Sequence, residues 1–355
     1  MSDTTKSSRR SFVKSIASGS AGISLFPLLS YGRHNKTKSS NEKSDITFVH
    51  LADMHVMRQR KGDEGYKRCV DEINTLNPKP DFVLMGGDGP FTGLYTEIDE
   101  FEDQVSLFKS ISNQLEMPHY HCIGNHDCLG LHENRKVSPD HPEIGKKFIM
   151  NRLGMERSYY SFNVKNWHFV VLDCIQETVE EHGPGFIPEF GEEQLEWLRY
   201  DLGRNFGMPT VIVTHIAVFC NVGQILGNPD MKSMHDRVVQ DGRALREILQ
   251  RHNVKVVLQA HSHIIEDYNY KGIWYVTSQA VSGSWWGGDW NLGFGPGYTV
   301  FGIKDENITW GRRDFQWEPH LEPDDTFHRE QNERWRTHLN EQQKLLEEEK
   351  QASVN

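Results

Sequence analysis

The chain has 355 residues, of which 37% are hydrophobic and 11% aromatic, which is enough for one large core or two modest ones. Residues 1–44 hold eight of the 39 basic and two of the 50 acidic residues, so the remaining 31 and 48 give residues 45–355 a formal charge of −17. This acidic balance argues against binding of nucleic-acid polymers, and a site for anions must supply its own positive charge. The five cysteines lack paired metal spacings, which favours buried thiols.

The amino terminus differs from the rest of the chain. Arg9 and Arg10 precede Phe12 and Lys14, and a run rich in Gly, Ser, Ala and Leu follows from residue 15 to 29. This pattern resembles a twin-arginine export signal, and residues 31–44 have the composition of a disordered linker. We expect residues 1–44 to be signal and linker, and the twin-arginine translocase to be a partner during export. The protein is then exported, periplasmic or envelope-associated in a bacterium; retention of the run as an uncleaved anchor is the alternative.

From residue 45, short apolar runs alternate with amphipathic stretches, which predicts a β-α-β-α-β order. The predicted strands are 45–52, 81–85 and 118–123, and the predicted helices between them are 65–76 and 97–112. A helix is predicted at 142–153. An antiparallel hairpin follows, because the predicted strands 159–164 and 167–173 are separated only by Lys165 and Asn166.

The second half continues this alternation and ends in a charged helix. A helix is predicted around Leu195, Leu198 and Leu202, and another at 243–251. Strands are predicted at 210–214, 254–259, 272–278, 297–303 and 307–312. Residues 324–355 are charged and Glu-rich, which favours a solvated or docking helix. We expect one domain over residues 45–315 and a helical tail over 316–355.

Five of the predicted buried strands end in residues able to ligate a metal ion. In chain order these are Asp53 and His55, Asp88, Asn125 with His126 and Asp127, His215, and His261 with His263. Each motif alone is common in turns or serves as a polar cap at a strand end. Parallel strands, however, bring their carboxyl ends to one edge of a sheet, and carboxylate, amide and imidazole groups are ligands of divalent cations. The set therefore predicts a metal site.

The ordered blocks Asp-x-His, Gly-Asp, Gly-Asn-His-Asp, a lone His and Ala-His-x-His resemble the calcineurin-like metallophosphoesterase family. Some stretches are similar to its purple acid phosphatase-like and class III cyclic nucleotide phosphodiesterase-like members. The resemblance covers about residues 46–303. It implies an α/β fold, a four-layer αββα sandwich with two mixed β-sheets.

The resemblance also implies two divalent metal ions, which the mixed nitrogen and oxygen donors would allow to be Mn, Fe, Zn or Co. One metal would be held by Asp53, His55 and His263, the other by Asn125, His215 and His261, with Asp88 bridging both. Two positions depart from the family pattern. Phe91 stands where some members carry Asp or Tyr, which argues against a tyrosinate-iron site, and Ala260 replaces a Gly without removing a ligand.

The implied reaction is hydrolysis of a phosphoester bond in a small substrate, with a hydroxide shared by the two metals as nucleophile. His126 is the expected general acid, oriented by Asp127. A phosphodiester and a phosphomonoester substrate both remain open, and so does the oligomeric state. Two other readings are an exported metal- or phosphate-binding envelope protein without turnover, and an interaction protein that acts through its charged C-terminal helix.

Trp285 and Trp286 follow the last histidine block within a Gly- and Ser-rich stretch, which should bring them near the metals. They are candidate substrate-binding residues, because an indole offers a flat face on which a nucleobase or another ring can stack. The alternative is that the pair closes the end of the sandwich and the glycines only turn the chain. The sequence supports both interpretations equally.

Overall fold

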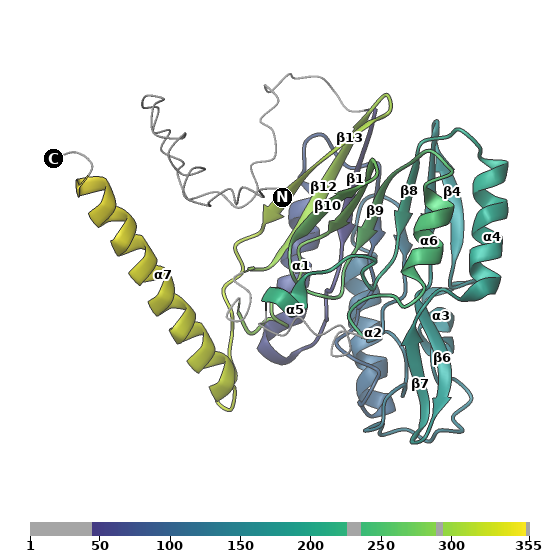
Figure 1. Cartoon of the computed structure of the whole chain (residues 1–355). Coiled ribbons are helices and arrows are strands. Elements are labelled where there is room, and N and C mark those ends of the chain that lie inside the picture. Colours follow the sequence, from purple (N-terminus) through teal and green to yellow (C-terminus); the bar gives the residue numbers. More distant parts are fainter. Residues whose placement is uncertain (1–44, 226–235, 289–293, 353–355) are drawn as a thin grey trace, which may run out of the picture. The chain divides into compact units, whose positions relative to one another are not determined.

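The computed structural model describes residues 45–225, 236–288 and 294–352, and two β-sheets that pack face to face lie at its centre (Figure 1). The first sheet has five strands in the order β13-β12-β1-β2-β3, and the second has six in the order β10-β11-β9-β8-β5-β4. The predicted export signal and linker lie outside the described residues. Among the described residues, no helix combines the length and apolar character needed to cross a bilayer.

The first sheet is mixed. Its parallel strands are β1 (Ile46–Leu51), β2 (Phe82–Met85) and β3 (His119–His121). On the other side of β1, β12 (Gly297–Lys304) pairs antiparallel with it, and β13 (Asn307–Asp314) pairs antiparallel with β12. Residues from the two ends of the domain therefore meet at β1.

The second sheet is also mixed. Its four parallel strands are β5 (Trp167–Val171), β8 (Thr210–Val213), β9 (Val254–Gln259) and β11 (Ile273–Thr277). The edge strands, β4 (Tyr160–Val164) and β10 (Glu266–Tyr270), pair antiparallel with their neighbours. A separate hairpin consists of β6 (Ile175–Glu180) and β7 (Gly183–Pro188).

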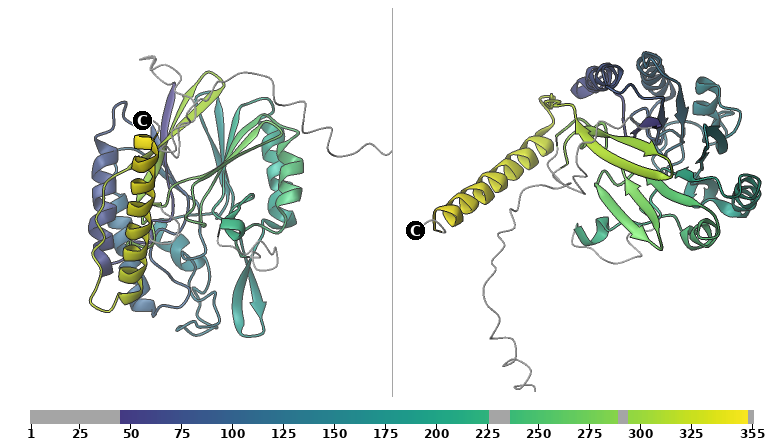
Figure 2. Two further views of the ribbon diagram at one scale, coloured as in Figure 1. Left: turned by 60° about the vertical axis from the view of Figure 1, so that its left-hand side comes forward. Right: turned by 90° about the horizontal axis from the view of Figure 1, so that it is seen from above.

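Helices cover the outer face of each sheet, which confirms the predicted sandwich with two mixed sheets (Figure 2). The first sheet packs against α1 (Gly62–Asn74) and α2 (Ile98–Ser112), and the second against α4 (Gly191–Arg204) and α6 (Gly242–Leu249). The remaining helical segments are a short 3₁₀ turn (Gln59–Lys61), α3 (Lys147–Leu153), α5 (Val222–Ile225) and α7 (Thr326–Ala352).

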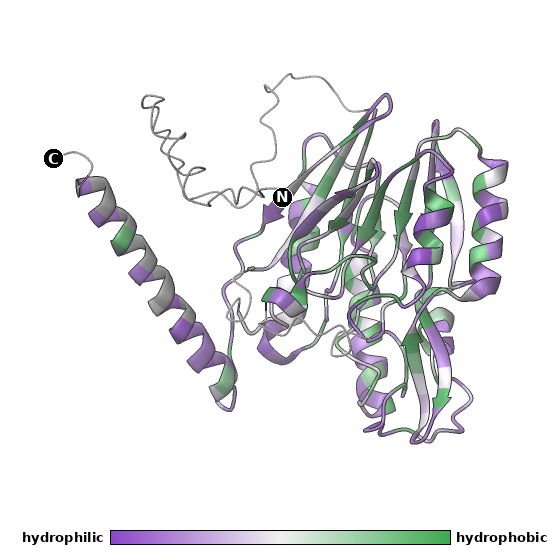
Figure 3. Cartoon of the chain, viewed as in Figure 1, coloured by the Kyte–Doolittle hydropathy of each residue, from purple (hydrophilic) through white to green (hydrophobic). Residues whose placement is uncertain are grey.

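The alternation of side chains along β1 explains these layers. Ile46 and Phe48 point into the core between the sheets, whereas Val49 and Leu51 belong to the core beneath α1 and α2. A strand buried on both faces reads as a continuous apolar run, and hydropathy is accordingly highest in the central strands (Figure 3). The ring of Phe48 stacks on those of Phe82 and Phe301, with centroids 5.2 and 4.9 Å apart.

Three strands were not predicted, namely β6, β7 and β10. Their sequences are rich in polar residues or in Gly and Pro, and most of their side chains are at least partly exposed. An edge strand or an isolated hairpin needs no continuous apolar run, because it does not lie between two packed layers. Hydrophobic periodicity therefore finds the central strands and misses these.

The packing of Phe48 between the sheets leads to a stability prediction. We expect Phe48→Ala to lower the free energy of unfolding by about 3–5 kcal/mol, because it leaves a cavity among rings that cannot collapse. Phe206→Ala is the matched control, since that ring is 78% exposed and its loss should change stability by no more than about 0.5 kcal/mol. Urea denaturation followed by circular dichroism measures both, and equal effects would contradict this account of the core.

Candidate metal centre

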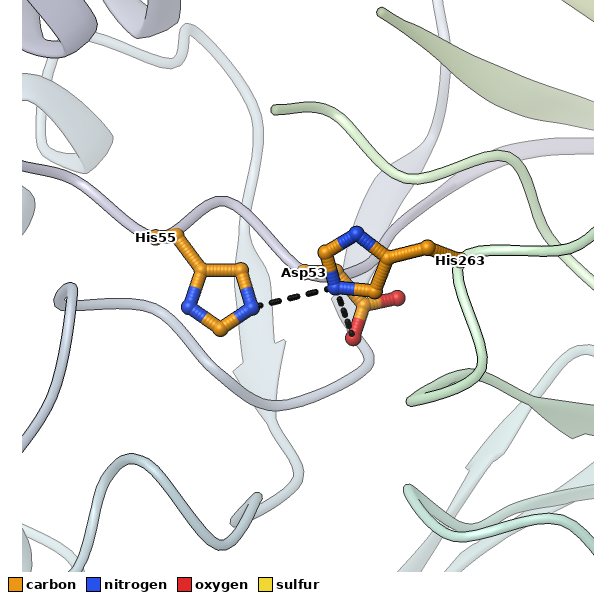
Figure 4. Close-up of side chains that lie close together, drawn as sticks. All are labelled: Asp53, His55 and His263. Carbon is orange, nitrogen blue, oxygen red and sulfur yellow. Dashed lines mark hydrogen bonds and ion pairs between the residues drawn. The ribbon is translucent and has the colours of Figure 1, made fainter. Parts of the chain in front are cut away.

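The first group of ligands comes from the loops after β1 and β9. Asp53 and His55 follow β1, and His263 reaches them from the loop after β9 (Figure 4). One ligand atom from each residue lies within 4.8 Å of the others. His55 Nε2 is 3.2 Å from His263 Nε2, which in turn is 3.7 Å from Asp53 Oδ1. The spacing suits three donors that surround one cation.

The second group consists of Asp88, His215 and His261, which follow β2, β8 and β9. Their ligand atoms again lie within 4.8 Å of one another. Asn125, from the loop after β3, places its Oδ1 3.2 Å from His215 Nε2 and so adds an amide oxygen. All seven predicted metal ligands therefore converge at the carboxyl edge of the two sheets.

Asp88 is the member of the second group that also lies beside the first. Its Oδ2 is 3.6 Å from His55 Nε2 in the first group and 3.2 Å from His215 Nε2 in the second. Its Oδ1 accepts a 2.8 Å hydrogen bond from the backbone N–H of His126. A Cβ on Gly124 would lie 2.2 Å from this Oδ1, so glycine is required there. The carboxylate is thus positioned to contact metals in both groups.

Backbone carbonyls hold the second ring nitrogen of each site histidine. His55 and His126 both use Nδ1 to contact the carbonyl of Phe91, at 3.0 and 2.9 Å. His215 Nδ1 contacts Gly86 O at 2.8 Å, His263 Nδ1 contacts Gly283 O at 2.6 Å, and His261 Nε2 contacts Asp236 O at 3.0 Å. A carbonyl can only accept, so the contacting nitrogen carries a proton, and in the candidate ligands the other nitrogen is the one that would bind a metal.

The protonation of the ligands also suits metal binding. Burial lowers the pKa of His55 and of His261 well below the usual range, so both rings are neutral. Burial opposes ionisation of Asp88, but the imidazoles of His215 and His126 outweigh it and hold the pKa of Asp88 well below its usual range. In His215 the effect of burial is exceeded by attraction to Asp88, and its pKa rises to about 9. A metal at His215 therefore displaces a proton.

These donors fit divalent cations. They are carboxylate, amide and imidazole groups, buried except for the partly exposed His261 and His263, and such a set is typical of Mn, Fe, Zn and Co sites without thiolate. All five cysteines are free, and none belongs to either group of ligands found among the described residues. Without cations, Asp53 and Asp88 would be two buried carboxylates in close proximity, which is electrostatically costly.

The ligand loops have strained backbones. Five ligands adopt left-handed φ angles, namely Asp53 at 54°, His55 at 44°, Asp88 at 56°, His261 at 69° and His263 at 55°. This conformation costs a residue with a Cβ roughly 1–2 kcal/mol. Such strain persists only where the surrounding structure holds it, and it is concentrated at functional sites. The loops are held because each lies between a buried strand and the hydrogen bonds of the centre.

The expected contact between Asp127 and His126 is wrong. The ring of His126 is fixed by Phe91 O, as described above, while the Asp127 carboxylate accepts three backbone hydrogen bonds from Asp88, Gly89 and Gly124 at 2.7–3.0 Å. Asp127 thus anchors the loop that carries Asp88. Burial, with the nearby Asp88 charge, raises the pKa of Asp127.

The two tryptophans have different surroundings, so the paired prediction needs correction. Trp286 is fully buried, and its Nε1 donates to Met54 O and His55 O at 3.1 Å, which excludes contact with a substrate. Trp285 is 40% exposed, and its ring centroid lies 5.8 Å from that of His55 and 6.2 Å from that of His126. Trp286 packs on α1 in the core outside the first sheet, and of the two tryptophans only Trp285 is exposed beside the centre.

Sequence reasoning missed the backbone groups that support the centre. The carbonyls of Phe91, Gly86 and Gly283 orient the histidines, but any residue type presents a carbonyl. The side chain of Phe91 provides no ligand, which agrees with the presence of Phe where some family members carry Asp or Tyr. Ala260 is fully buried, and its N–H donates to His215 O at 2.8 Å, so the methyl group is accommodated.

Comparison with known proteins identifies proteins that are similar to this chain in sequence or in fold. A stretch of 88 residues is 33% identical to a probable glycerophosphodiester phosphodiesterase from Arcobacter nitrofigilis, and it covers 22% of this chain and 29% of that relative. The chain thus matches less than a third of this curated relative. A dimetal phosphatase from Danio rerio has a similar fold, with a TM-score of 0.55 and 13% identity over 77% of this chain and 97% of that one.

A phosphopantetheinyl hydrolase from Mycobacterium tuberculosis superimposes with a TM-score of 0.43 and 14% identity, over 66% of this chain and 89% of that one. The family model described as calcineurin-like phosphoesterase matches residues 46–264. This range contains all seven convergent ligands and the loop of His126 and Asp127. The chain therefore belongs to the calcineurin-like phosphoesterase family.

Proposed function

We propose that this protein hydrolyses phosphoester bonds with two divalent metal ions. The observation that carries this proposal is the position of Asp88 between two groups of buried ligands, with its Oδ2 within 3.6 Å of a histidine nitrogen in each. A structural metal site needs only one closed set of ligands. Two sets joined by one carboxylate favour catalysis at a pair of metals.

The candidate ligands would form two cation sites that share one residue. Asp53, His55 and His263 would hold one cation, Asn125, His215 and His261 the other, and Asp88 both. When bound, such cations supply Lewis acidity and lower the pKa of water, which provides a nucleophile near neutral pH. The cations would also supply the positive charge that an acidic surface lacks for an anionic substrate.

His126 is the proposed general acid. Its ring lies against that of His55, with centroids 4.8 Å apart, and it is partly exposed rather than enclosed. Because Nδ1 is engaged by Phe91 O, proton transfer would use Nε2. In its imidazolium form, His126 would give the Nε2 proton to the leaving oxygen as the bond from that oxygen to phosphorus breaks, and the ring would return to its neutral form.

The substrate class is a small phosphoester. The relative from Arcobacter nitrofigilis is named as a probable phosphodiesterase and the structure from Danio rerio as a phosphatase, so the names of relatives favour neither diester nor monoester. The competing function is a metal- or phosphate-binding protein without turnover. His126 argues against that function, since a passive binder needs no acid beside its metals.

The proposed site of action is outside the cytoplasm. The twin-arginine pattern of Arg9 and Arg10 supports export by the translocase that carries folded proteins. Metal loading in the cytoplasm, before export, is compatible with this route. Replacement of both arginines by lysine in a bacterial host, followed by fractionation, tests it; an unchanged distribution would contradict the proposal.

The first prediction concerns Asp88. We expect Asp88→Asn to reduce bound metal from about two ions to one or none per chain, and turnover at least about 100-fold, because a neutral amide bridges cations poorly. Elemental analysis and hydrolysis of p-nitrophenyl phosphate and bis-p-nitrophenyl phosphate measure both quantities. Asp103→Asn is the matched control, since Asp103 only pairs with Arg58 on the surface. Full metal content with normal turnover in Asp88→Asn would refute the site.

The second prediction separates His126 from the ligands. His126→Ala should retain both metals but lose about 10²–10⁴-fold in turnover of esters with poor leaving groups, and less with p-nitrophenolate, which needs no proton. His252→Ala serves as control, because His252 precedes β9 at the opposite end from the centre. If metal content falls in proportion to the rate, His126 is a ligand and not the acid.

The third prediction follows from the corrected role of Asp127. Asp127→Asn should lower the free energy of unfolding by about 1–3 kcal/mol and weaken metal binding, because an amide group faces three N–H donors with one acceptor oxygen. Thermal unfolding and metal titration measure these effects. A variant that keeps its stability and metal affinity and changes only the leaving-group dependence would instead place Asp127 with the general acid.

A further inference from the structure

Residues 282–288, here named the tryptophan loop, border the metal centre although they lie beyond the residues that match the family. Inside the protein, the loop contacts the ligands directly. Ser282 Oγ donates to Asp53 O at 2.8 Å, and His263 Nδ1 donates to Gly283 O at 2.6 Å. The conformation of the loop and the placement of the ligands therefore depend on each other.

Trp285 is the part of this loop that faces solvent beside the centre. Its ring centroid lies 5.8, 5.9 and 6.2 Å from those of His55, His263 and His126, and 40% of the residue is exposed. An exposed indole at this distance offers an apolar face next to the reacting phosphoryl group. Aromatic rings pack favourably on such a face.

The backbone of the loop is strained at this point. Trp285 and Trp286 have φ angles of 49° and 64°, which is the left-handed region in two consecutive residues with bulky side chains. Surrounding contacts have to hold such a conformation. Burial of its indole holds Trp286, but Trp285 is exposed, so its position depends on contacts to the loop backbone.

An arginine and an acidic residue of the C-terminal segment provide the first of these contacts. Arg60 Nη1 donates to Trp285 O at 3.0 Å. The same guanidinium group makes two hydrogen bonds to the Asp325 carboxylate, at 3.0 and 2.7 Å, and both side chains are at most 15% exposed. Asp325 therefore holds the arginine that holds Trp285.

Helix α7 provides the second contact. Asn332, 8% exposed, donates from Nδ2 to Gly287 O at 2.7 Å. A Cβ on Gly287 would lie 2.3 Å from the ring of His328, so the glycine allows α7 to approach the loop closely. The residues of α7 after Asn332 whose side chains are described are exposed. Among the α7 residues whose side chains are described, those that support the loop thus lie in the first two turns.

We propose that residues 322–332 position the tryptophan loop for substrate selection, so that Trp285 favours phosphoesters with an aromatic ring on the group that is not expelled. The proposal rests on the phosphoesterase function above for its substrate part. Trp285 would contact the substrate, and Asp325 and Asn332 are positioning residues. The C-terminal tail then has a role in hydrolysis itself, in contrast to a tail that serves only as a docking helix.

Hydrogen exchange of the full chain, followed by mass spectrometry, tests the positioning without any substrate. Asn332→Ala should increase exchange in peptides that cover residues 282–288 at least about threefold, since the contact that holds them is lost. Asn340→Ala, an exposed asparagine two turns further along α7, is the matched control. Equal exchange in the wild-type chain and both variants would overturn the proposal.

Kinetics test the selection with two esters that share the p-nitrophenolate leaving group, bis-p-nitrophenyl phosphate and methyl p-nitrophenyl phosphate. Trp285→Ala and Asn332→Ala should each reduce the preference for the first ester about three- to tenfold relative to the wild-type chain, through KM rather than kcat. Asn332→Ala should have no further effect on this preference when Trp285 is already Ala, because both act through one contact.

The outcomes separate this proposal from the proposed function. Equal losses on both esters, or full additivity of the two substitutions, would assign Asn332 a purely structural role and overturn the inference. If the wild-type chain with two bound metals hydrolyses neither diester, the selection proposal fails, and hydrolysis of p-nitrophenyl phosphate then decides whether the phosphoesterase function fails with it. Increased exchange in Asn332→Ala would in that case still establish that α7 holds the loop.

Discussion

The structure depends on one carboxylate, that of Asp88, at a position where two groups of histidines meet. A buried carboxylate is favourable only with positive charge or hydrogen-bond donors around it. Here the His126 backbone N–H engages one oxygen, and the other lies beside His55 and His215. The loop that carries Asp88 is in turn anchored by Asp127. Metal binding, catalysis and the stability of this edge of the sandwich therefore share the same contacts.

The sandwich supplies the rigidity that this centre requires. Left-handed backbone at five ligands would be lost in a flexible loop, since every such residue gains by relaxing. The loops that carry these five residues follow the largely buried parallel strands β1, β2 and β9, which contribute to the aromatic and aliphatic core between the sheets. Backbone carbonyls then set the tautomers of the histidines. A stable, nonpolar interior thus holds a polar and strained edge in a conformation able to bind metal.

Outside the residues that match the family model, the tryptophan loop borders the candidate centre. The adjacent residues Trp285 and Trp286 serve opposite purposes, because one indole is buried under the His55 loop while the other stays at the surface. Arg60, close to the first ligands, and Asp325, close to the C-terminus, meet across this loop. Segments at the two ends of the domain are thereby coupled to the same side of the site.

The sequence by itself determined the candidate ligands and the central strands. Apolar runs identify strands buried on both faces, and metal-binding residue types at the ends of five such strands, Asp53, His215 and His263 among them, are recognised as a set. Only the tertiary structure decided the role of Asp127, the separation of Trp285 from Trp286, and the existence of β6, β7 and β10. These depend on which backbone groups and surfaces meet across sequence separations of 38 to 265 residues, and residue type alone does not reveal such contacts. The residue types that could bind metal can therefore be recognised in the sequence, whereas the orientation and burial of side chains depend on the fold.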